Sequence, residues 1–274
     1  MDIERQVASH YTQGRLESAI LDALTKSGKD PDKLAHTDLS GADEFHLGWY
    51  AETDDFAREL GFPRDSHVLD IGSGIGGPAR HVAAVLGCRV TGLDLTEEFV
   101  QVATSLTQRC GLADRVSFRQ GSALALPFED GTFDGAMLMH VGMNIADKAR
   151  LFSEARRVLK PGKRFGVYDI MRVGEGALPY PMPWAMTEAT SFVEEPEAYR
   201  RHLASGGFEV EKERNRRDFV LTLAREMREK IAREGMPPLG PQILGADMQE
   251  RIGNLMKVLE RGTIAPIEII ARAV

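Results

Sequence analysis

The segment VLDIGSGIGGPARHVA, residues 68–83, joins a run of apolar residues to a helical pattern through a glycine-rich turn. Counted from Gly72, the turn has the spacing G-x-G-x-x-G, which is typical of the turn after the first strand of a parallel α/β sheet. Glycines allow unusual backbone angles and a close approach of the backbone to a ligand. The segment therefore predicts a strand, a ligand-binding turn and a helix.

Strand and helix patterns alternate from this segment to residue 170. Apolar strands are expected at 67–71, 89–93, from 116, at 133–139 and at 164–170, with helices at 78–86, 97–110 and 147–159. Such alternation favours right-handed crossovers and a mostly parallel sheet that helices cover on both faces. The predicted fold class is α/β.

Helical patterns flank this region. The first 25 residues have helical spacing that Gly14 bends or splits, and a polar loop at 28–41 leads to a helix at 52–60. Residues 174–184 contain too many Gly and Pro residues for regular structure. Beyond them, helices are expected at 197–204, 218–233 and 246–261, and strands at 208–212 and 266–274.

Two carboxylates point to the ligand of the glycine turn. Asp94 ends the second strand, where it can accept hydrogen bonds from both ribose hydroxyls of a nucleoside. Asp70 lies two residues before Gly72 and would repel the pyrophosphate of a dinucleotide. It would suit the ammonium and sulfonium charges of S-adenosylmethionine, which has no phosphate. The turn is therefore predicted to bind S-adenosylmethionine, although a purely structural role for Asp70, as a cap of the turn, stays open.

Charge and composition narrow the class of partner and the location. The net charge is −7, and no basic face is indicated, so nucleic acid is not an expected partner. The two cysteines, Cys88 and Cys110, have no motif spacing and are expected to be buried and reduced. The N-terminus has no apolar signal core, and no run of about 18 apolar residues occurs. A cytoplasmic protein with no membrane partner and no metal site is predicted.

The segments VLDIGSGIGGPARHVA, TGLDLT, FRQGSALALPFEDGTFD and EARRVLKPGKRFGVYDI resemble successive motifs of class I S-adenosylmethionine-dependent methyltransferases. The resemblance runs from about residue 43 to 170 and is strongest to the small-molecule group: ubiquinone/menaquinone-type, sarcosine–dimethylglycine and sugar methyltransferases. It implies a Rossmann-like, doubly wound sheet. With the flanking patterns, it predicts an N-terminal helical cap (1–62), an S-adenosylmethionine-binding core (63–173), and a helical lid insertion with the last strands of the core sheet (174–274).

The resemblance also implies roles for individual residues. Asp70 would lie behind the methionine part of the cofactor, Leu95 would pack on the adenine, and Asp94 would bind the ribose. Many family members have an aspartate at the position of Ser122 to accept the adenine amino group, so this contact would lose its charge here. The methionine part would be lined by Gly72, Gly74 and Gly76, and the adenine would be bordered by the segment 121–124, which includes Ser122 and Ala123.

The segment after the fourth strand, MLMHVGMNI, places His140, Met143 and Asn144 at the expected reaction centre. Methyl transfer is an in-line displacement that requires alignment, exclusion of water and, for a hydroxyl or carbon acid, removal of a proton. His140 is the best candidate for the base, although it could instead shape the cofactor site. An unprotonated amine acceptor would need no base.

Further residues are expected to close the site. His46 and Tyr50 precede the first strand and could contact the methionine carboxylate of the cofactor. Tyr11 and Trp184 could screen the sulfonium through cation–π contacts. The late helices carry methionines that could form a lid over a partly apolar acceptor.

The sequence predicts an S-adenosylmethionine-dependent methyltransferase that acts on a small organic molecule. Two alternatives remain open: a nicotinamide-dependent oxidoreductase and a non-catalytic S-adenosylmethionine-binding regulator. An oxidoreductase would need a proton-relay motif such as Tyr-x-x-x-Lys, which this chain does not have near the fourth or fifth strand. A non-catalytic regulator would give no reason for the polar residues in MLMHVGMNI. The acceptor, the choice among N-, O- and C-methylation and the oligomeric state stay undetermined.

Overall fold

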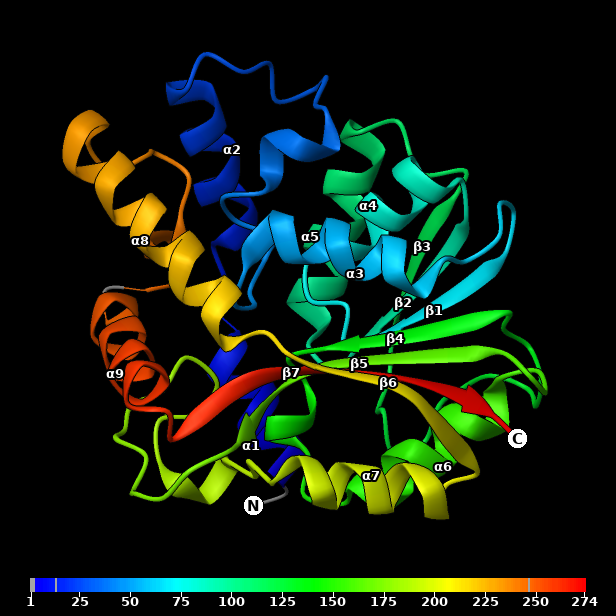
Figure 1. The fold of residues 1–274 in the computed structure, drawn as a ribbon. Coiled ribbons are helices and arrows are strands. Elements are labelled where there is room, and N and C mark those ends of the chain that lie inside the picture. Colours follow the sequence, from blue (N-terminus) through cyan, green and yellow to red (C-terminus); the bar gives the residue numbers. More distant parts are fainter. Residues whose placement is uncertain (1–2, 13, 246) are drawn as a thin grey trace.

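The computed structural model describes residues 3–12, 14–245 and 247–274 (Figure 1). Its strands are β1 (His67–Ile71), β2 (Arg89–Asp94), β3 (Val116–Gln120), β4 (Gly135–Met139), β5 (Arg164–Arg172), β6 (Phe208–Asn215) and β7 (Ile264–Ala273). Its α-helices are α1 (Ile3–Tyr11), α2 (Leu16–Lys26), α3 (Trp49–Leu60), α4 (Gly77–Leu86), α5 (Glu97–Arg109), α6 (Lys148–Val158), α7 (Pro196–Ser205), α8 (Arg217–Glu234) and α9 (Met248–Arg261). Short 3₁₀ turns are η1 (His36–Leu39), η2 (Gly142–Asn144), η3 (Glu188–Thr190) and η4 (Pro241–Leu244).

The described strands form one seven-stranded sheet in the order β3-β2-β1-β4-β5-β7-β6. The first five are parallel, whereas β7 pairs antiparallel with both β5 and β6. The predicted mostly parallel α/β fold is confirmed. Because the chain order reverses between β1 and β4, the carboxyl ends of these two strands border the crevice where open α/β sheets bind ligands.

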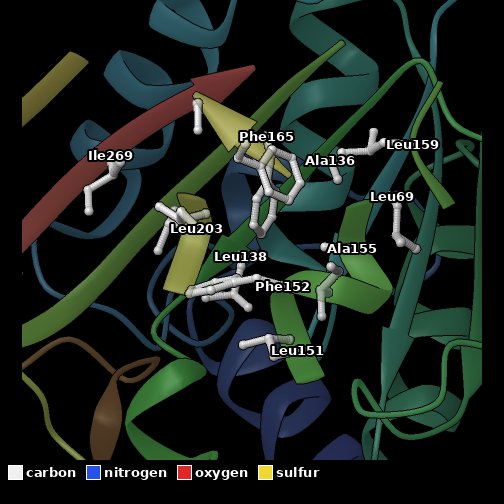
Figure 2. Packing of buried hydrophobic residues seen from close by; sticks show 14 of the residues in the cluster. Leu69, Ala136, Leu138, Leu151, Phe152, Ala155, Leu159, Phe165, Leu203 and Ile269 are labelled. Atoms are coloured by element: carbon white, nitrogen blue, oxygen red, sulfur yellow. The ribbon is translucent and has the colours of Figure 1, made fainter. Parts of the chain in front are cut away.

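Helices cover both faces of the sheet, and each face has its own apolar core (Figure 1). Phe56 and Leu60 of α3 pack with Val82 of α4 on one face. On the other face, Phe152 of α6 packs with Leu203 of α7 (Figure 2). All residues of β4 are buried, as expected for a central strand with both faces covered. Helix α3, which falls within the predicted N-terminal cap, therefore packs against one face of the sheet.

The glycine turn between β1 and α4 has the backbone that its sequence predicts. Gly72, Gly74 and Gly76 have φ angles of 75°, 53° and 86°, which favour glycine. A Cβ atom on Gly72 would lie 2.3 Å from a methyl carbon of Val141, so β1 can approach the segment after β4 only without a side chain there. The turn therefore brings the two strand ends together.

The C-terminal part inserts α8 and α9 between β6 and β7. These helices pack with the irregular segment 174–195 in an apolar cluster that includes Trp184, Val220 and Leu255. Helix α9 begins at Met248, and its expected start, Ala246, lies outside the described residues. None of the described helices is both long and apolar enough to cross a lipid bilayer.

Among the predicted boundaries that differ from the observed ones, two have clear local reasons. Helix α3 starts at Trp49, three residues earlier than expected, because Gly48 has a φ of 88° and ends the preceding loop there. The fourth strand starts at Gly135, because Phe133 forms only an isolated bridge with Leu159.

Candidate active site

A cavity of about 730 Å³ lies at the carboxyl ends of the central strands, a size typical of small-molecule sites. Its walls come from the glycine turn, the end of β2, the segment after β4, residues 41–49, α1, Pro183–Trp184 and α9. Of the residues expected at the site, Gly76, Tyr50 and Ser122 lie outside these walls. The walls contain Tyr11, His46, Asp70, Gly72, Gly74, Asp94, Leu95, Ala123, His140, Met143, Asn144 and Trp184.

Four buried polar atoms in the cavity wall have no hydrogen-bond partner within the described chain: Oδ1 of Asp43, Oδ2 of Asp70, Oγ of Ser73 and Nε2 of His140. A buried polar group without a partner costs about 1–3 kcal/mol. Such atoms gathered around one cavity are typical of a site that a polar ligand completes. The positively charged groups and hydroxyls of S-adenosylmethionine fit this donor and acceptor set.

Asp70 is buried at the end of β1. Burial, together with the negative charges of Asp94 and Glu44, raises the pKa of Asp70 from its ordinary value of 3.8 to about 8. A positively charged ligand in the cavity would stabilise the ionised carboxylate, whereas a phosphate would be repelled. This geometry favours a cationic ligand over a dinucleotide.

The Asp94 carboxylate ties the glycine turn to the end of β2. Its Oδ2 accepts a hydrogen bond from the Gly74 N–H at 2.8 Å, and its Oδ1 accepts one from the Thr96 N–H at 2.8 Å. The carboxylate also lies in the cavity wall, where its oxygens can accept hydrogen bonds from a ligand. Burial raises the pKa of Asp94. The arrangement can accept hydrogen bonds from a pair of adjacent hydroxyls.

His46 is held between acceptors on both ring nitrogens. Its Nε2 lies 2.7 Å from Oε2 of Glu44, and its Nδ1 lies 3.2 Å from the Leu47 carbonyl oxygen. The Thr53 hydroxyl also donates to Glu44, at 2.6 Å. Although burial opposes protonation, the hydrogen bond and charge of Glu44 raise the pKa of His46. Protonation of His46 is therefore favoured, as an ion pair with Glu44 in the cavity wall.

His140 follows β4 in a left-handed backbone conformation, with a φ of 53°. Its N–H donates to the Tyr168 carbonyl at 2.7 Å, and its ring stacks on Tyr168 with centroids 4.9 Å apart. Burial lowers the pKa of His140 well below 6.5, and the charge of His46, whose ring centroid is 5.8 Å away, lowers it further. The cavity therefore meets a neutral imidazole, held in a conformation that a non-glycine residue rarely adopts.

Asn144 joins three segments around the cavity. Its Oδ1 accepts from the Tyr11 hydroxyl at 3.1 Å, and its Nδ2 donates to the carbonyls of Trp184 at 2.8 Å and Thr190 at 3.2 Å. The amide is thus engaged with the protein, and it fixes α1 and the segment around 184–190 to the end of β4.

Two expected ligand contacts are directed elsewhere. The ring of Tyr50 packs edge-on against His81, with centroids 4.9 Å apart. The hydroxyl of Ser122 donates to the carboxylate of Glu4, which itself lines the cavity. Sequence reasoning missed Glu4, Glu44 and Ser73. Ser73 lies inside the glycine motif and Glu44 lies two residues before His46, but no local signal marks Glu4.

Part of this chain is similar in sequence to known proteins. Residues 69–167 match the methyltransferase domain family. Methyltransferase phqN of Penicillium fellutanum is 39% identical over 113 residues, which are 41% of this chain and 35% of that protein. Sterol 24-C-methyltransferase ERG6B of Gibberella zeae is also 39% identical over 113 residues, or 41% of this chain and 30% of that protein. This chain therefore spans about a third of the length of these relatives.

A solved structure of geranyl diphosphate C-methyltransferase from Streptomyces coelicolor A3(2), in complex with S-adenosyl-L-homocysteine, has the same fold. The TM-score is 0.70 at 16% identity, over 100% of this chain and 99% of that one. Fold and cavity define an α/β protein with a cavity of small-molecule size at the carboxyl edge of its sheet. More specifically, residues 69–167 match the methyltransferase domain family, and the chain has the fold of a solved methyltransferase. The predicted resemblance and fold are confirmed, and the names of these similar proteins agree with the predicted enzyme class.

Proposed function

We propose that this chain catalyses methyl transfer from S-adenosylmethionine to a small, largely apolar organic molecule. One observation carries the proposal: a single cavity connects the carboxylates at the glycine turn with an apolar compartment, and the neutral ring of His140 lies in its wall. The apolar walls are formed by Ile3, Val7, Met143, Ile252, Leu255 and Met256.

The residues at the glycine-turn end of this cavity hold the cofactor. Asp94 accepts hydrogen bonds from the ribose hydroxyls, and Leu95 and Ala123 border the adenine. Gly72 and Gly74 leave room for the methionine part beside the backbone. Asp70 faces its ammonium group, and the His46 imidazolium faces its carboxylate. When bound, the cofactor supplies a methyl group on a positively charged sulfur, which becomes a neutral thioether as the new bond to the acceptor forms.

His140 can accept a proton at Nε2 when the acceptor is a hydroxyl or an acidic carbon. Its low pKa keeps this nitrogen unprotonated across the neutral pH range. Asn144 acts by position, because its hydrogen bonds hold α1 and Trp184 against the cavity. These walls exclude water from the reaction centre. An amine acceptor that is already unprotonated would require alignment alone.

The acceptor class is supported by the walls and by the names of similar proteins. A sterol and geranyl diphosphate, both with large apolar parts, are named for two of them. The cavity also has carboxylates at Asp43, Glu44, Asp70 and Asp94, and the chain carries a net charge of −7, which disfavours nucleic acid. We place the cofactor in the core (63–173), with the cap (1–62) and the lid (174–274) supplying α1 and α9 as walls.

The proposal is tested by titrating the protein with S-adenosylmethionine, S-adenosylhomocysteine and NADH in a calorimeter. The protein is then incubated with methyl-labelled cofactor and a panel of apolar alcohols, acids, amines and alkenes. We expect both adenosyl compounds to bind, NADH not to compete, and labelled product to form in equal amount to S-adenosylhomocysteine. Absence of binding contradicts the proposal, and binding without turnover of any acceptor favours a regulator.

A further inference from the structure

Arg251 of α9 is the single arginine or lysine among the described residues of the cavity wall. It lies in the apolar compartment beside Ile252 and Leu255, and its side chain is only 11% exposed. The wall also contains six acidic side chains: Glu4, Asp43, Glu44, Asp70, Asp94 and Asp147. A buried guanidinium in an otherwise apolar compartment requires a specific reason, because burial of a charge is costly.

Asp247 fixes the orientation of this guanidinium. Its Oδ2 accepts from Arg251 Nε at 3.1 Å and from Nη2 at 2.7 Å. Asp247 itself is not part of the cavity wall, and its side chain is 40% exposed. The edge of the guanidinium formed by Nε and Nη2 is therefore paired outside the cavity, and Nη1 belongs to the other edge.

Nη1 of Arg251 shares its hydrogen-bond partner, Nε2 of His10, with another group. Nη1 lies 3.2 Å from Nε2 of His10, but the same Nε2 also lies 3.0 Å from the carbonyl oxygen of Pro183. Burial lowers the pKa of His10, so its imidazole is neutral. A neutral Nε2 either donates to Pro183 or accepts from Arg251, and it cannot do both. When it donates to Pro183, the Nη1 hydrogens of Arg251 lack the acceptor that His10 would provide.

The position of Arg251 sets the length of a ligand that reaches it. Contacts lead from Arg251 to His10, from its neighbour Tyr11 to Asn144, and Asn144 follows His140 by one turn of chain. The guanidinium thus lies across α1 from the end of β4. A molecule that contacts both His140 and Arg251 must extend past His10 and Tyr11, in a cavity whose wall also contains Ile252 and Leu255.

We propose that Arg251 binds a carboxylate at the distal end of an elongated, apolar methyl acceptor. This inference rests on the proposed function and names its substrate class. Asp247 occupies one edge of the guanidinium from outside the cavity, and the other edge, with Nη1, can donate hydrogen bonds to the oxygens of a ligand carboxylate. A diphosphate would bring more negative charge to a guanidinium that Asp247 already pairs. The preferred ligand is therefore an apolar acid with a single charge.

The test compares matched acids and alcohols on three variants. Decanoate and decanol, and geranate and geraniol, are titrated into protein saturated with S-adenosylhomocysteine. The variants are Arg251→Gln, Arg251→Lys and, as control, Lys257→Gln, which removes an exposed cation from the same helix outside the cavity. In the unchanged protein, each acid should bind about tenfold or more tightly than its alcohol. Arg251→Gln should abolish this preference, Arg251→Lys should keep part of it, and Lys257→Gln should keep it all.

Several results would overturn the inference: equal binding of acid and alcohol, no binding of either acid, or an unchanged preference in Arg251→Gln. The affinity for S-adenosylhomocysteine, measured first in each protein, separates this outcome from failure of the proposed function. If the unchanged protein does not bind S-adenosylhomocysteine, the proposed function is contradicted. If it binds S-adenosylhomocysteine normally but shows no preference for acids, only the role of Arg251 is contradicted.

Discussion

The hydroxyl of Ser122 donates a hydrogen bond to the carboxylate of Glu4, a residue 118 positions earlier in the chain. Ser122 follows β3 in the segment that family resemblance assigns to the adenine, and Glu4 lies in the first turn of α1 with its side chain in the cavity wall. Related enzymes often have an aspartate at this position. Residue 122 of this chain is a serine without a carboxylate, and Glu4 of the N-terminal helix places one beside it.

Replacement of Glu4 tests this relationship. Glu4→Ala should weaken binding of S-adenosylhomocysteine by about 5- to 10-fold, because the acceptor for the adenine amino group is lost. Glu4→Gln should weaken it less, since the amide oxygen still accepts. Glu17→Ala is a matched control, because Glu17 accepts from Ser105 of α5, and neither residue lines the cavity. Unchanged affinity in Glu4→Ala would argue against the assignment.

Asp94 should be the strongest single determinant of cofactor affinity. Asp94→Ala removes two ligand contacts and the hydrogen bond that orients Gly74, so the dissociation constant should rise by roughly 100-fold. The dissociation constant of Asp94→Asn should lie between those of the unchanged protein and Asp94→Ala. Calorimetric titration measures the effect, with Asp134→Ala as control, since that carboxylate pairs with Lys160 outside the cavity. Equal losses in Asp94→Ala and Asp134→Ala would indicate a general loss of structure.

The raised pKa of Asp70 predicts pH-dependent cofactor binding. Below pH 8 the carboxyl of the free protein is mainly protonated, since its pKa is about 8. The cationic cofactor favours the carboxylate, so binding should release a proton, and affinity should rise with pH up to about 8. Titration in buffers of different ionisation enthalpy counts this proton. Asp70→Asn should bind more weakly and release fewer protons; the same proton release in the variant would contradict the assignment.

The same group should destabilise the free protein at high pH. Its pKa is about 8 in the folded state and about 3.9 in an unfolded chain, so the unfolded state gains stability by ionising as pH rises from about 4 to about 8. Asp70→Asn should therefore raise the melting temperature of the ligand-free protein by at least about 2 °C at pH 8, and by less at pH 5.5. A loss of stability at pH 8 would contradict this prediction.

His140→Ala should affect turnover more than cofactor binding. If a proton must leave the acceptor, turnover should fall by roughly 10²–10⁴-fold with the affinity for S-adenosylhomocysteine nearly unchanged. Because burial lowers the pKa of His140, the rate of the unchanged protein should fall only well below pH 6.5. His67→Gln is a control, because His67 begins β1 at the opposite edge of the sheet. Loss of cofactor binding in His140→Ala would instead assign this ring to the cofactor wall.

Local patterns were sufficient to predict the central part of the fold. Continuous apolar strands, helical periodicity and turn residues are short-range signals, and they located the strands from His67 to Arg172 within a few residues. The positions of Asp70 and Asp94 also follow from strand ends, because parallel strands bring their carboxyl ends to one edge. The antiparallel pairing of β7 with β5 and β6 had no local signal, since it depends on contacts between distant segments.

The sequence by itself determined the parallel core, the glycine turn and the two acidic strand ends. Each depends on residues that are neighbours in the chain or share one edge of a sheet. Only the tertiary structure decided which side chains complete the cavity. Glu4 reaches Ser122, Tyr11 reaches Asn144 and Arg251 reaches His10 across more than a hundred residues, because α1 and α9 pack over the strand ends. Burial, which also depends on this packing, makes His140 neutral and raises the pKa of Asp70.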